Sequence, residues 1–424
     1  MKVWLITVGE PLPIGGADDR LLRTGLLAET LAAGGHDVAW WTSAFDHLRK
    51  RHHVQRDTQI DVGPRYQIRL LHAPRYGTNV SLRRILNHRG IAGKFRRLAP
   101  NVPPPDVILC SLPLLELCRE ATEYARQRRI PVVLDVRDMW PDAIVELAPR
   151  WIRPLIRPLF RRSRRSVIHS CQSATAITGI TDGLIGWALD YADRERTALD
   201  RPFPMGYREK KPHERDLVEA QKFWRRYGIS TESGEFVVCF FGTIGRHFEI
   251  ETIVHAARIL SQSSRRVRFV LCGTGPQIEK WRRLAADCEN VLLTGWVNAA
   301  KIWTLMRMSS AGLAPYVSTR DFRLSIPNKP IEYLSAGLPI ISSLQGVLAD
   351  LLADHRCGIT YANGDAEQLS RAVIECYDNK ERLESMSTHA GRLFRRRFVA
   401  ETVYREMQDY LAQIVGSDIL RPAA

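Results

Sequence analysis

The stretch Ser325-Ile-Pro-Asn-Lys-Pro-Ile-Glu-Tyr-Leu-Ser-Ala-Gly-Leu-Pro-Ile-Ile-Ser-Ser343 predicts a helix with both ends marked, followed by a short buried strand. Ser325 or Asn328 is expected to cap the helix, and Gly337 with Pro339 ends it. The first turn of a helix collects free backbone N–H groups and the positive end of the helix dipole. Such a helix start therefore favours an anion, for example a phosphate group.

Two charged side chains share one face of this predicted helix. Lys329 falls in the first turn, and Glu332 follows three residues later. A cation at the helix start with a carboxylate one turn deeper suits a ligand with phosphate at one end and hydroxyl groups at the other, such as a nucleotide sugar. An ordinary Lys–Glu surface pair would give the same pattern, so the helix alone leaves both interpretations open.

Both halves of the chain alternate strands with helices, which predicts α/β domains built on parallel sheets. Strands are expected at residues 2–8, 36–42, 66–71, 106–111, 132–135, 236–241, 267–272, 291–294, 311–315, 338–341 and 358–361. The basic segment 200–212 separates the halves, which gives domains at 1–200 and 201–395 and a C-terminal helix at 396–424 that we expect to pack back on the first domain. Open parallel sheets bind ligands at the carboxyl ends of their strands, and two facing domains would form a cleft.

Composition narrows the class of protein. A chain of 424 residues is too long for one core, which agrees with two domains of about 200 residues each. The eight cysteines form no Cys-x-x-Cys pair, which argues against a metal site or a disulfide framework and favours a reducing cytoplasm. No apolar run reaches the roughly 20 residues that span a bilayer, and residues 2–8 suit a buried strand better than a signal peptide.

The net charge of +15 is unevenly distributed. Residues 49–97 hold thirteen Lys or Arg against two acids, and residues 150–165 hold seven arginines, among them Arg150, Arg153 and Arg157, and no acid. In the second stretch the arginines alternate with large apolar residues, a composition typical of a helix lying at a membrane interface, and its two prolines predict two short helical pieces. A solvated basic face is the alternative interpretation.

Several segments, in order, resemble the glycosyltransferase family 4 pattern, whose members are retaining, nucleotide-sugar-dependent enzymes of the GT-B fold with two Rossmann-like domains. The segments that carry this resemblance are Gly15-Gly16, Gly35-His-Asp-Val38, Phe241-Gly-Thr-Ile-Gly-Arg246, Cys272-Gly-Thr-Gly-Pro276, Thr294-Gly-Trp-Val297, Ala314-Pro-Tyr316, Pro327-Asn-Lys-Pro-Ile-Glu-Tyr333 and Ala336-Gly-Leu-Pro339. Asp135-Val-Arg-Asp-Met-Trp-Pro141 resembles a motif of the members that build bacterial surface polysaccharides. The similarity spans nearly the whole chain.

The resemblance implies a role for each matching residue. Glu332 would bind the ribose hydroxyls, Arg246 and Lys329 would neutralise the diphosphate, and Asp138 would contact the donor sugar or the acceptor. The other donor-binding residues would be Gly15, Gly16, Gly242, Gly273, Thr274, Gly275, Pro276, Trp296, Val297, Ser325, Ile326 and Asn328. Arg137, Arg150, Arg153 and Arg157 would serve the acceptor or the membrane. Taken singly, the glycine pairs also suit ordinary strand-to-helix turns, and Asp138 also suits a turn before Pro141.

The chain departs from the family pattern in three places. Leu324 stands where the donor motif usually has its first glutamate, Arg137 and Asp138 replace a histidine that many members carry, and Glu249 replaces a glycine. No Asp-x-Asp pair suits a metal ion, and arginine with lysine can neutralise a diphosphate, so we expect neither a metal nor a cofactor.

The sequence therefore predicts a glycosyltransferase that moves a sugar from a nucleotide donor, expected to be UDP-linked, to a lipid-linked or saccharide acceptor in surface polysaccharide assembly. We expect it in the cytoplasm, bound peripherally to the anionic inner membrane surface and without a nucleic-acid partner. A UDP-sugar 2-epimerase of the same fold is one alternative. A basic nucleic-acid-binding protein is another, although no stacking or helix-turn-helix motif supports it. A dinucleotide dehydrogenase is disfavoured because no Gly-x-Gly-x-x-Gly follows the first strand.

Overall fold

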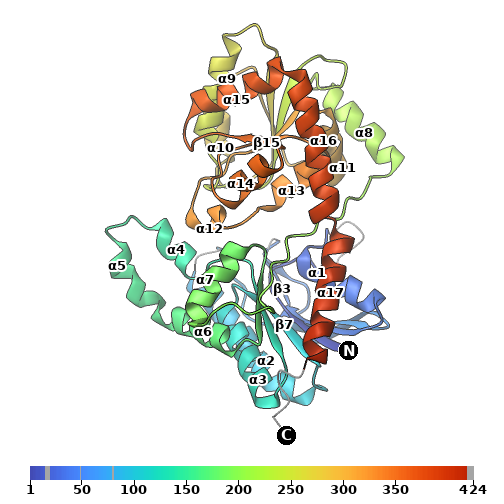
Figure 1. Ribbon diagram of the computed structural model, residues 1–424, viewed down its shortest axis with the longest axis vertical. Coiled ribbons are helices and arrows are strands. Elements are labelled where there is room, and N and C mark those ends of the chain that lie inside the picture. The colour runs from blue at the N-terminus through green and yellow to red at the C-terminus, as the bar shows by residue number, and fades with distance from the viewer. Residues whose placement is uncertain (15–19, 48, 79–80, 418–424) are drawn as a thin grey trace. The chain divides into compact units, whose positions relative to one another are not determined.

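The computed structural model describes residues 1–14, 20–47, 49–78 and 81–417, which form two units (Figure 1). The first unit comprises Met1–Gly206 and Ala400–Ala424, and the second comprises Tyr207–Val399. Each unit has its own parallel sheet and its own apolar core. No helix among the described residues is long and apolar enough to cross a bilayer.

The first unit contains a seven-stranded sheet in the order β5-β6-β2-β1-β7-β8-β9. Its strands are β1 (Lys2–Ile6), β2 (Asp37–Ser43), β5 (Thr58–Gly63), β6 (Tyr66–Leu71), β7 (Val107–Leu112), β8 (Val132–Val136) and β9 (Ala176–Gly179). Among the strand pairs described for this sheet, only the edge pair β5–β6 is antiparallel. From β6 to β9 the strand order is that of a Rossmann-like sheet, with its switch point between β1 and β7. A small hairpin, β3 (Phe45–Asp46) and β4 (Arg51–His52), follows β2.

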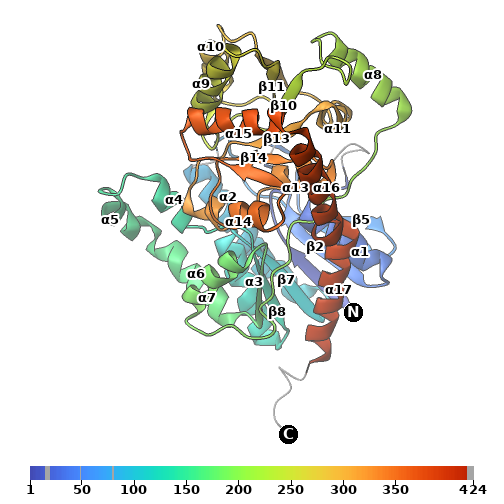
Figure 2. The ribbon, with the colours of Figure 1, turned by 45° about the horizontal axis from the view of Figure 1, so that its top comes forward.

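Most helices of the first unit lie between its strands along the chain, one follows β9, and the last one follows the second unit. They are α1 (Arg23–Ala33), α2 (Leu82–Leu98), η1 (Ala99–Asn101), α3 (Leu115–Arg128), α4 (Asp142–Leu147), α5 (Arg153–Ile156), η2 (Arg157–Phe160), α6 (Arg161–Ser173), α7 (Asp182–Ala192) and α17 (Ala400–Gly416). The basic stretch 150–165 thus forms the short pieces α5 and η2 and the start of α6, as its prolines predict. In both views α4 and α5 project away from the sheet of this unit (Figures 1 and 2).

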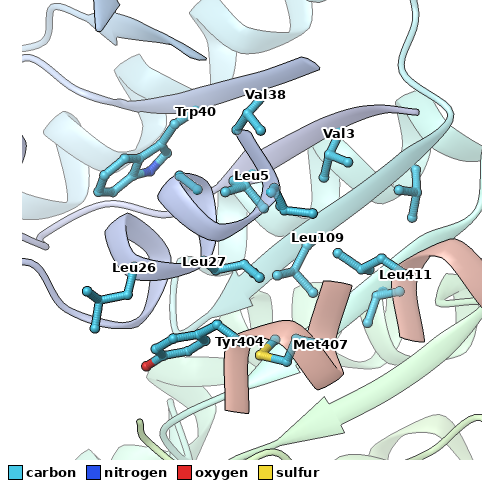
Figure 3. Packing of buried hydrophobic residues seen from close by; sticks show 14 of the residues in the cluster. Val3, Leu5, Leu26, Leu27, Val38, Trp40, Leu109, Tyr404, Met407 and Leu411 are labelled. Carbon is cyan, nitrogen blue, oxygen red and sulfur yellow. The ribbon is translucent and has the colours of Figure 1, made fainter. Parts of the chain in front are cut away.

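The chain returns to the first unit through α17, which completes its core (Figure 3). Tyr404, Met407 and Leu411 of α17 are fully buried in one cluster with Leu27 and Leu109. The Tyr404 hydroxyl also accepts a hydrogen bond from the backbone N–H of Gly206 at 3.1 Å. The C-terminal helix is therefore an integral part of the first unit, because removing it would expose one face of the sheet to water.

The second unit contains a six-stranded parallel sheet in the order β12-β11-β10-β13-β14-β15, again a Rossmann-like order with its switch point between β10 and β13. Its strands are β10 (Phe236–Phe241), β11 (Val267–Cys272), β12 (Val291–Gly295), β13 (Ala311–Ala314), β14 (Ile340–Ser342) and β15 (Gly358–Thr360). Its helices are α8 (Glu214–Arg225), α9 (Ile250–Ser261), α10 (Ile278–Leu284), α11 (Ala299–Met308), α12 (Arg320–Arg323), α13 (Asn328–Ser335), α14 (Val347–Asp354), α15 (Ala366–Asp378) and α16 (Lys380–Arg397).

Candidate functional site

The candidate site in the second unit lies at the switch point of the sheet, where the connections of β10 and β13 leave in opposite directions. The segment after β10 pairs with the segment after β13: the N–H of Glu249 donates to the Pro315 carbonyl at 2.9 Å, and that of Val317 donates to the His247 carbonyl at 2.9 Å. The chain then passes through α12 into α13, which carries Lys329 and Glu332. The two crossovers thus bring the predicted phosphate-binding residues to one edge of the sheet.

The loops after β10 and β11 interlock through their backbones. The Gly242 N–H donates to the Cys272 carbonyl and the Ile244 N–H to the Thr274 carbonyl, both at 2.9 Å. Gly273 has a φ of +147°, and a Cβ atom on it would overlap with the carbonyl oxygen of Gly242. Glycine is therefore required at this position for both its backbone angle and the close approach of the two loops.

Lys329 extends from the first turn of α13 across the face of Gly242. A Cβ atom on Gly242 would lie only 2.6 Å from the Lys329 Nζ. The ammonium also lies 5.0 Å from the ring centroid of Phe248 and 6.0 Å from that of Tyr316, within the range of cation–π attraction. Half-buried among aromatic rings, this cation is held at the carboxyl edge of the sheet, where a phosphate group would meet it.

Glu332 lies one turn deeper in α13 and is only 7% exposed. Burial, with a smaller contribution from the Glu332 carboxylate, raises the pKa of the Tyr316 hydroxyl. Glu332 is therefore close to the Tyr316 side of the switch point, on the same helix face as Lys329. Its low exposure means that a ligand must reach into the site to contact it.

Arg246 is exposed on the loop after β10 and lines a cavity of about 620 Å³, together with Glu249 and Lys280. Burial raises the pKa of Glu249, even though its carboxylate accepts a hydrogen bond from the Gly364 N–H at 3.0 Å. The described residues that line this cavity do not include Lys329 or Glu332. The structure therefore places Arg246 near the switch point without bringing it into one cavity with the other two.

The helix start differs from the sequence prediction in its cap. The residue before the first turn of α13 is Pro327, and no side chain caps the helix. Ser325 instead donates through its hydroxyl to the Phe322 carbonyl at 3.4 Å, and Asn328 is already helical. The prediction of a Ser325 or Asn328 cap is wrong, because Pro327 already holds the extended backbone that a cap residue needs. The first-turn N–H groups of α13 therefore receive no side-chain cap.

The remaining predicted donor-binding residues differ in exposure. Thr274, Pro276 and Trp296 are exposed, with Trp296 at 73%, whereas Val297 and Ile326 are buried. An exposed tryptophan beside a glycine loop is available to stack on a ligand ring, while Val297 and Ile326 contribute to packing. Gly15 and Gly16 lie outside the described residues.

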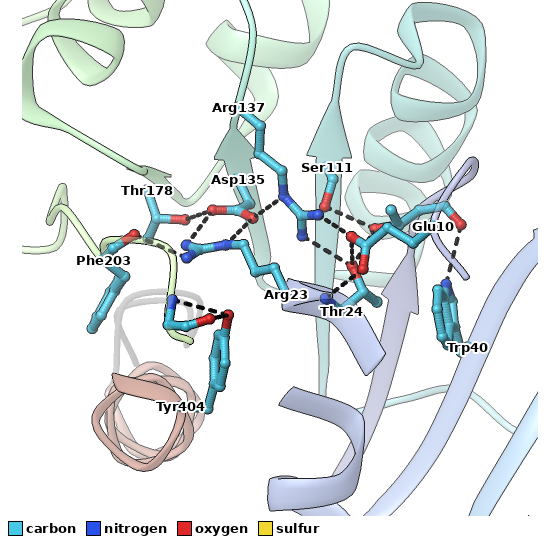
Figure 4. A network of polar contacts seen from close by, with 12 residues as sticks. Glu10, Arg23, Thr24, Trp40, Ser111, Asp135, Arg137, Thr178, Phe203 and Tyr404 are labelled. Atoms are coloured by element: carbon cyan, nitrogen blue, oxygen red, sulfur yellow. Dashed lines mark hydrogen bonds and ion pairs between the residues drawn. The ribbon is translucent and has the colours of Figure 1, made fainter. Parts of the chain in front are cut away.

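In the first unit, four charged side chains form a buried network at the carboxyl ends of β1 and β8 (Figure 4). Arg23 forms two hydrogen bonds with Asp135, both at 2.9 Å, and neither side chain is exposed. Arg137 bonds to the same carboxylate at 2.7 Å and also pairs with Glu10. Glu10 in turn accepts hydrogen bonds from the N–H and the hydroxyl of Thr24, at 2.9 and 2.6 Å. Two cations and two anions thus neutralise one another away from water.

This network also holds the segment that leads to the second unit. The Arg23 guanidinium donates to the carbonyl oxygens of Phe203 and Pro204, both at 2.9 Å. Burial alone would raise the pKa of Asp135, but the guanidiniums of Arg23 and Arg137 outweigh burial and lower it well below its usual 3.8. Asp135 therefore remains a carboxylate that anchors both arginines.

The network includes one predicted residue and adds residues that the sequence reasoning missed. Arg137, expected to serve the acceptor or the membrane, has a side chain that is 14% exposed and pairs with Asp135 and Glu10. The structure thus places Arg137 within the buried network. Arg23 and Glu10 were not predicted, because nothing in a linear sequence shows which buried charges meet. The available signal was the position of Glu10 and Asp135 at the ends of two apolar strands.

Asp138 follows this network directly after β8 and is half-buried. It lies between Arg137 and Met139, which is fully buried. Trp140 lies under the guanidinium of Arg84, 5.4 Å from the ring centroid, so the segment after β8 packs against the start of α2. Asp138 is thus held at the carboxyl edge of the first sheet, the edge at which such sheets bind ligands.

The two Rossmann-like sheets, each with its site edge at the strand carboxyl ends, define the GT-B fold. Residues 235–379 match the family model described as Glycosyl transferases group 1, so the second unit carries a domain of that kind. The Anabaena protein Alr3699/HepE in complex with UDP-glucose has the same fold. Its TM-score is 0.64 at 15% identity, over 97% of this chain and 100% of that one.

Two curated proteins resemble parts of the chain. One is the 2-deoxystreptamine N-acetyl-D-glucosaminyltransferase of Niallia circulans, 26% identical over 174 residues, which are 40% of this chain and 43% of that protein. Another is the GDP-mannose-dependent alpha-(1-6)-phosphatidylinositol monomannoside mannosyltransferase of Mycobacterium tuberculosis, 22% identical over 191 residues, which are 44% of this chain and 48% of that protein. The chain thus spans about half the length of the curated relatives it matches.

Proposed function

We propose that this protein is a retaining glycosyltransferase that moves a sugar from a nucleotide donor to a lipid-linked acceptor in the assembly of a bacterial surface polysaccharide. The observation that carries the proposal is the placement of Lys329 and Glu332 at the switch point of a glycosyl transferases group 1 domain. Transfer of a sugar to an acceptor is also the activity in the names of both curated relatives.

In the proposed reaction the diphosphate leaves as its bond to the sugar breaks, and negative charge develops on its oxygens. Lys329 and the N–H groups of the first turn of α13, which no side chain caps, would stabilise this charge, because they are fixed in place before the reaction begins. Arg246 would approach the diphosphate from the exposed loop after β10. Asp138 would contact the donor sugar or the acceptor from the first unit.

Glu332 would accept hydrogen bonds from the ribose hydroxyls of the donor. We expect Glu332→Gln to weaken binding of the nucleotide sugar, because a hydrogen bond to a charged group contributes about 1.5–3 kcal/mol. That loss corresponds to roughly a 10- to 100-fold weaker affinity. Calorimetric titration of the variant and the wild type with UDP-glucose and GDP-mannose measures the effect.

A matched control is Glu367→Gln, which changes the same group at the start of α15 in the same domain, where its side chain is 77% exposed. This variant should bind the donor as the wild type does. Equal affinity of the folded Glu332→Gln protein for every donor tested would remove Glu332 from the site. A thermal-shift screen of UDP-, GDP- and dTDP-sugars beforehand selects the donor, because a ligand that binds only the folded state raises Tm.

The 2-epimerase and nucleic-acid-binding alternatives are not favoured by the matched family and relatives. An epimerase would convert a UDP-sugar without any acceptor. Binding to DNA that disappears near physiological salt would be non-specific attraction to a basic surface. Product analysis with and without an acceptor separates the transferase from the epimerase.

The lipid-linked acceptor and the membrane surface are proposed from the arm formed by residues 150–160, which include α5 and η2. Trp151, Leu155 and Leu159 recur every four residues along this arm and are 76%, 72% and 79% exposed. Arg150 and Arg157 are also exposed and alternate with these apolar residues. Arg153 instead donates hydrogen bonds to the backbone carbonyls of Glu146 and Ala148. Exposed apolar side chains beside arginines suit the interface of an anionic bilayer.

We expect the triple variant Trp151→Ser, Leu155→Ser, Leu159→Ser to lose most of its binding to vesicles that contain phosphatidylglycerol. Each large side chain contributes about 1.5–3 kcal/mol when fully buried, so even partial insertion of three predicts at least a tenfold weaker partition. Co-sedimentation at low and high salt measures this. The control Val218→Ser, Ile259→Ser removes exposed apolar residues of the second unit, 41% and 40% exposed. Equal recovery of wild type in the supernatant with and without anionic lipid would contradict the proposal.

A further inference from the structure

A second cavity, of about 780 Å³, lies in the first unit between the β3–β4 hairpin, the segment after β6 and the first turns of α2. Four cationic side chains line it: Lys50, Arg51, Arg75 and Arg83. Among the described residues that line the cavity there is no carboxylate. Its volume falls within the range of small-molecule sites, about 300–1,000 Å³.

The acidic residues near this cavity are engaged elsewhere. Asp57 accepts hydrogen bonds from the Lys94 ammonium and from the backbone N–H of His72, both at 2.7 Å. Asp46 accepts from the N–H of Arg49 at 2.9 Å and lies 3.8 Å from the Nε2 atom of His53. Neither carboxylate lines the cavity, so an anion that entered it would meet a positive potential.

Two histidines at the cavity, His47 beside it and His72 in its wall, have lowered pKa values, chiefly because they are buried. The rings of His52 and His72 stack in its wall, with centroids 4.5 Å apart. Burial, followed by the charges of Lys50 and Arg84, lowers the pKa of the neighbouring His47 to about 4. Burial likewise lowers the pKa of His72, with His52 and Lys94 contributing in the same direction. The smaller contribution of the cations to these lowered pKa values agrees with the positive charge gathered around the cavity.

The opening of the cavity is apolar on one side. Leu86 lines it and is 55% exposed. Leu82 and Ile85, on the preceding turn of α2, are 79% and 41% exposed. Residues three and four positions apart share one helix face, so the three side chains form a continuous apolar strip beside the cationic cavity. Singly exposed apolar side chains are common, but three on one helix face beside a cluster of arginines are not expected of a solvated surface.

The geometry points to this cavity as a binding site for an anionic amphiphile, with its phosphate or diphosphate group between Arg75 and Arg83 and its hydrocarbon chain along the Leu82–Leu86 strip. A phosphate group accounts for the cations, and a hydrocarbon chain accounts for the exposed leucines, which a soluble phosphate alone would leave in water. The inference rests on the proposed function in one respect: such a ligand would be the lipid-linked acceptor or its carrier.

The experiment uses three soluble probes and the full-length protein: farnesyl diphosphate below its micellar concentration, inorganic pyrophosphate, and farnesol. We expect farnesyl diphosphate to bind at least tenfold more tightly than pyrophosphate, and farnesol not to bind measurably. The double variant Arg75→Ala, Arg83→Ala should bind farnesyl diphosphate and pyrophosphate at least tenfold more weakly than the wild type does. The double variant Leu82→Ser, Leu86→Ser should bind farnesyl diphosphate only as tightly as pyrophosphate. Its affinity for pyrophosphate should equal that of the wild type.

The matched control is Arg96→Ala, Arg97→Ala, which also removes two arginine charges but from the last turn of α2, the helix that carries Arg83. If both arginine pairs weaken farnesyl diphosphate equally, the protein attracts anions through its general charge and the site is overturned. Equal affinity of the wild type for farnesyl diphosphate and pyrophosphate would overturn the proposal that the ligand is an amphiphile. Titration of the same variants with the nucleotide sugar separates the two proposals: intact donor binding without any effect on farnesyl diphosphate refutes the cavity alone.

Discussion

Replacing Asp135 with asparagine is expected to lower the free energy of unfolding of the first unit by about 3–5 kcal/mol, the usual cost of breaking a buried ion pair from one side. The variant keeps the size of the side chain but leaves Arg23 and Arg137 with one anion, Glu10, for two buried cations. Arg23 also donates hydrogen bonds to the carbonyls of Phe203 and Pro204. The variant is therefore expected to loosen the segment that leads out of the first unit.

Calorimetry of the full chain measures this effect. For a unit of this size about 1 kcal/mol shifts Tm by about 2–4 °C, so the transition of the first unit should fall by roughly 6–20 °C. The control Asp37→Asn removes a carboxylate that pairs with Arg65 at the surface, where both side chains are 53% exposed. A surface pair contributes about 0–1 kcal/mol, so this control should keep its Tm within a few degrees. Equal Tm shifts in the two variants would contradict the role assigned to Asp135.

The pH dependence of the same comparison follows from the lowered pKa of Asp135. A carboxyl group whose pKa is lower in the folded than in the unfolded state stabilises the fold fully above its unfolded pKa of about 4. That stabilisation is lost as the pH falls toward the folded pKa. The difference in stability between wild type and Asp135→Asn should therefore be constant from about pH 5 to pH 8 and should shrink below about pH 4.

Gly273→Ala is expected to damage both the stability of the second unit and the donor site that we propose for it. The new methyl group would overlap with the Gly242 carbonyl oxygen, and alanine is strained at a φ of +147°. Strain at such an angle costs about 1–3 kcal/mol, and overpacking costs a similar amount, so a loss of at least ~2 kcal/mol is expected. The loop after β10 must move to relieve the overlap, and with it Arg246 and the surface on which Lys329 rests.

A displacement of about 1 Å can reduce a rate about 100-fold, so the proposed transferase activity should fall strongly even in the fraction of the variant that stays folded. Gly245→Ala is the matched control in the same loop. The nearest atom to its new methyl group would be the Thr243 carbonyl oxygen at 4.0 Å, and its backbone is outside the left-handed region. It should keep its stability within about 1 kcal/mol. A Gly273→Ala protein with wild-type Tm and donor affinity would show that the two loops do not interlock as described.

Much of the fold was predictable because its signals are local. The strands β10 and β11 and the helix α11 begin and end where the apolar pattern predicts, since a buried parallel strand needs an uninterrupted apolar run. The edge strand β5 was missed because most of its residues face solvent and its pattern has no apolar run. Helix α2 was missed because its arginines hide a narrow apolar face formed by Ile91, Ala92 and Phe95.

The sequence by itself determined the two α/β halves, the glycine loops and the positions of Lys329 and Glu332 on one short helix, because strand runs, turns and helix ends depend on neighbouring residues. Only the tertiary structure decided that Arg137 belongs to a buried network with Glu10, Arg23 and Asp135, and that arginines from separate segments line one cavity in the first unit. Charged residues far apart in the chain meet only when crossover connections bring strand ends together. A pattern of neighbouring residues does not show which distant residues will lie close in space.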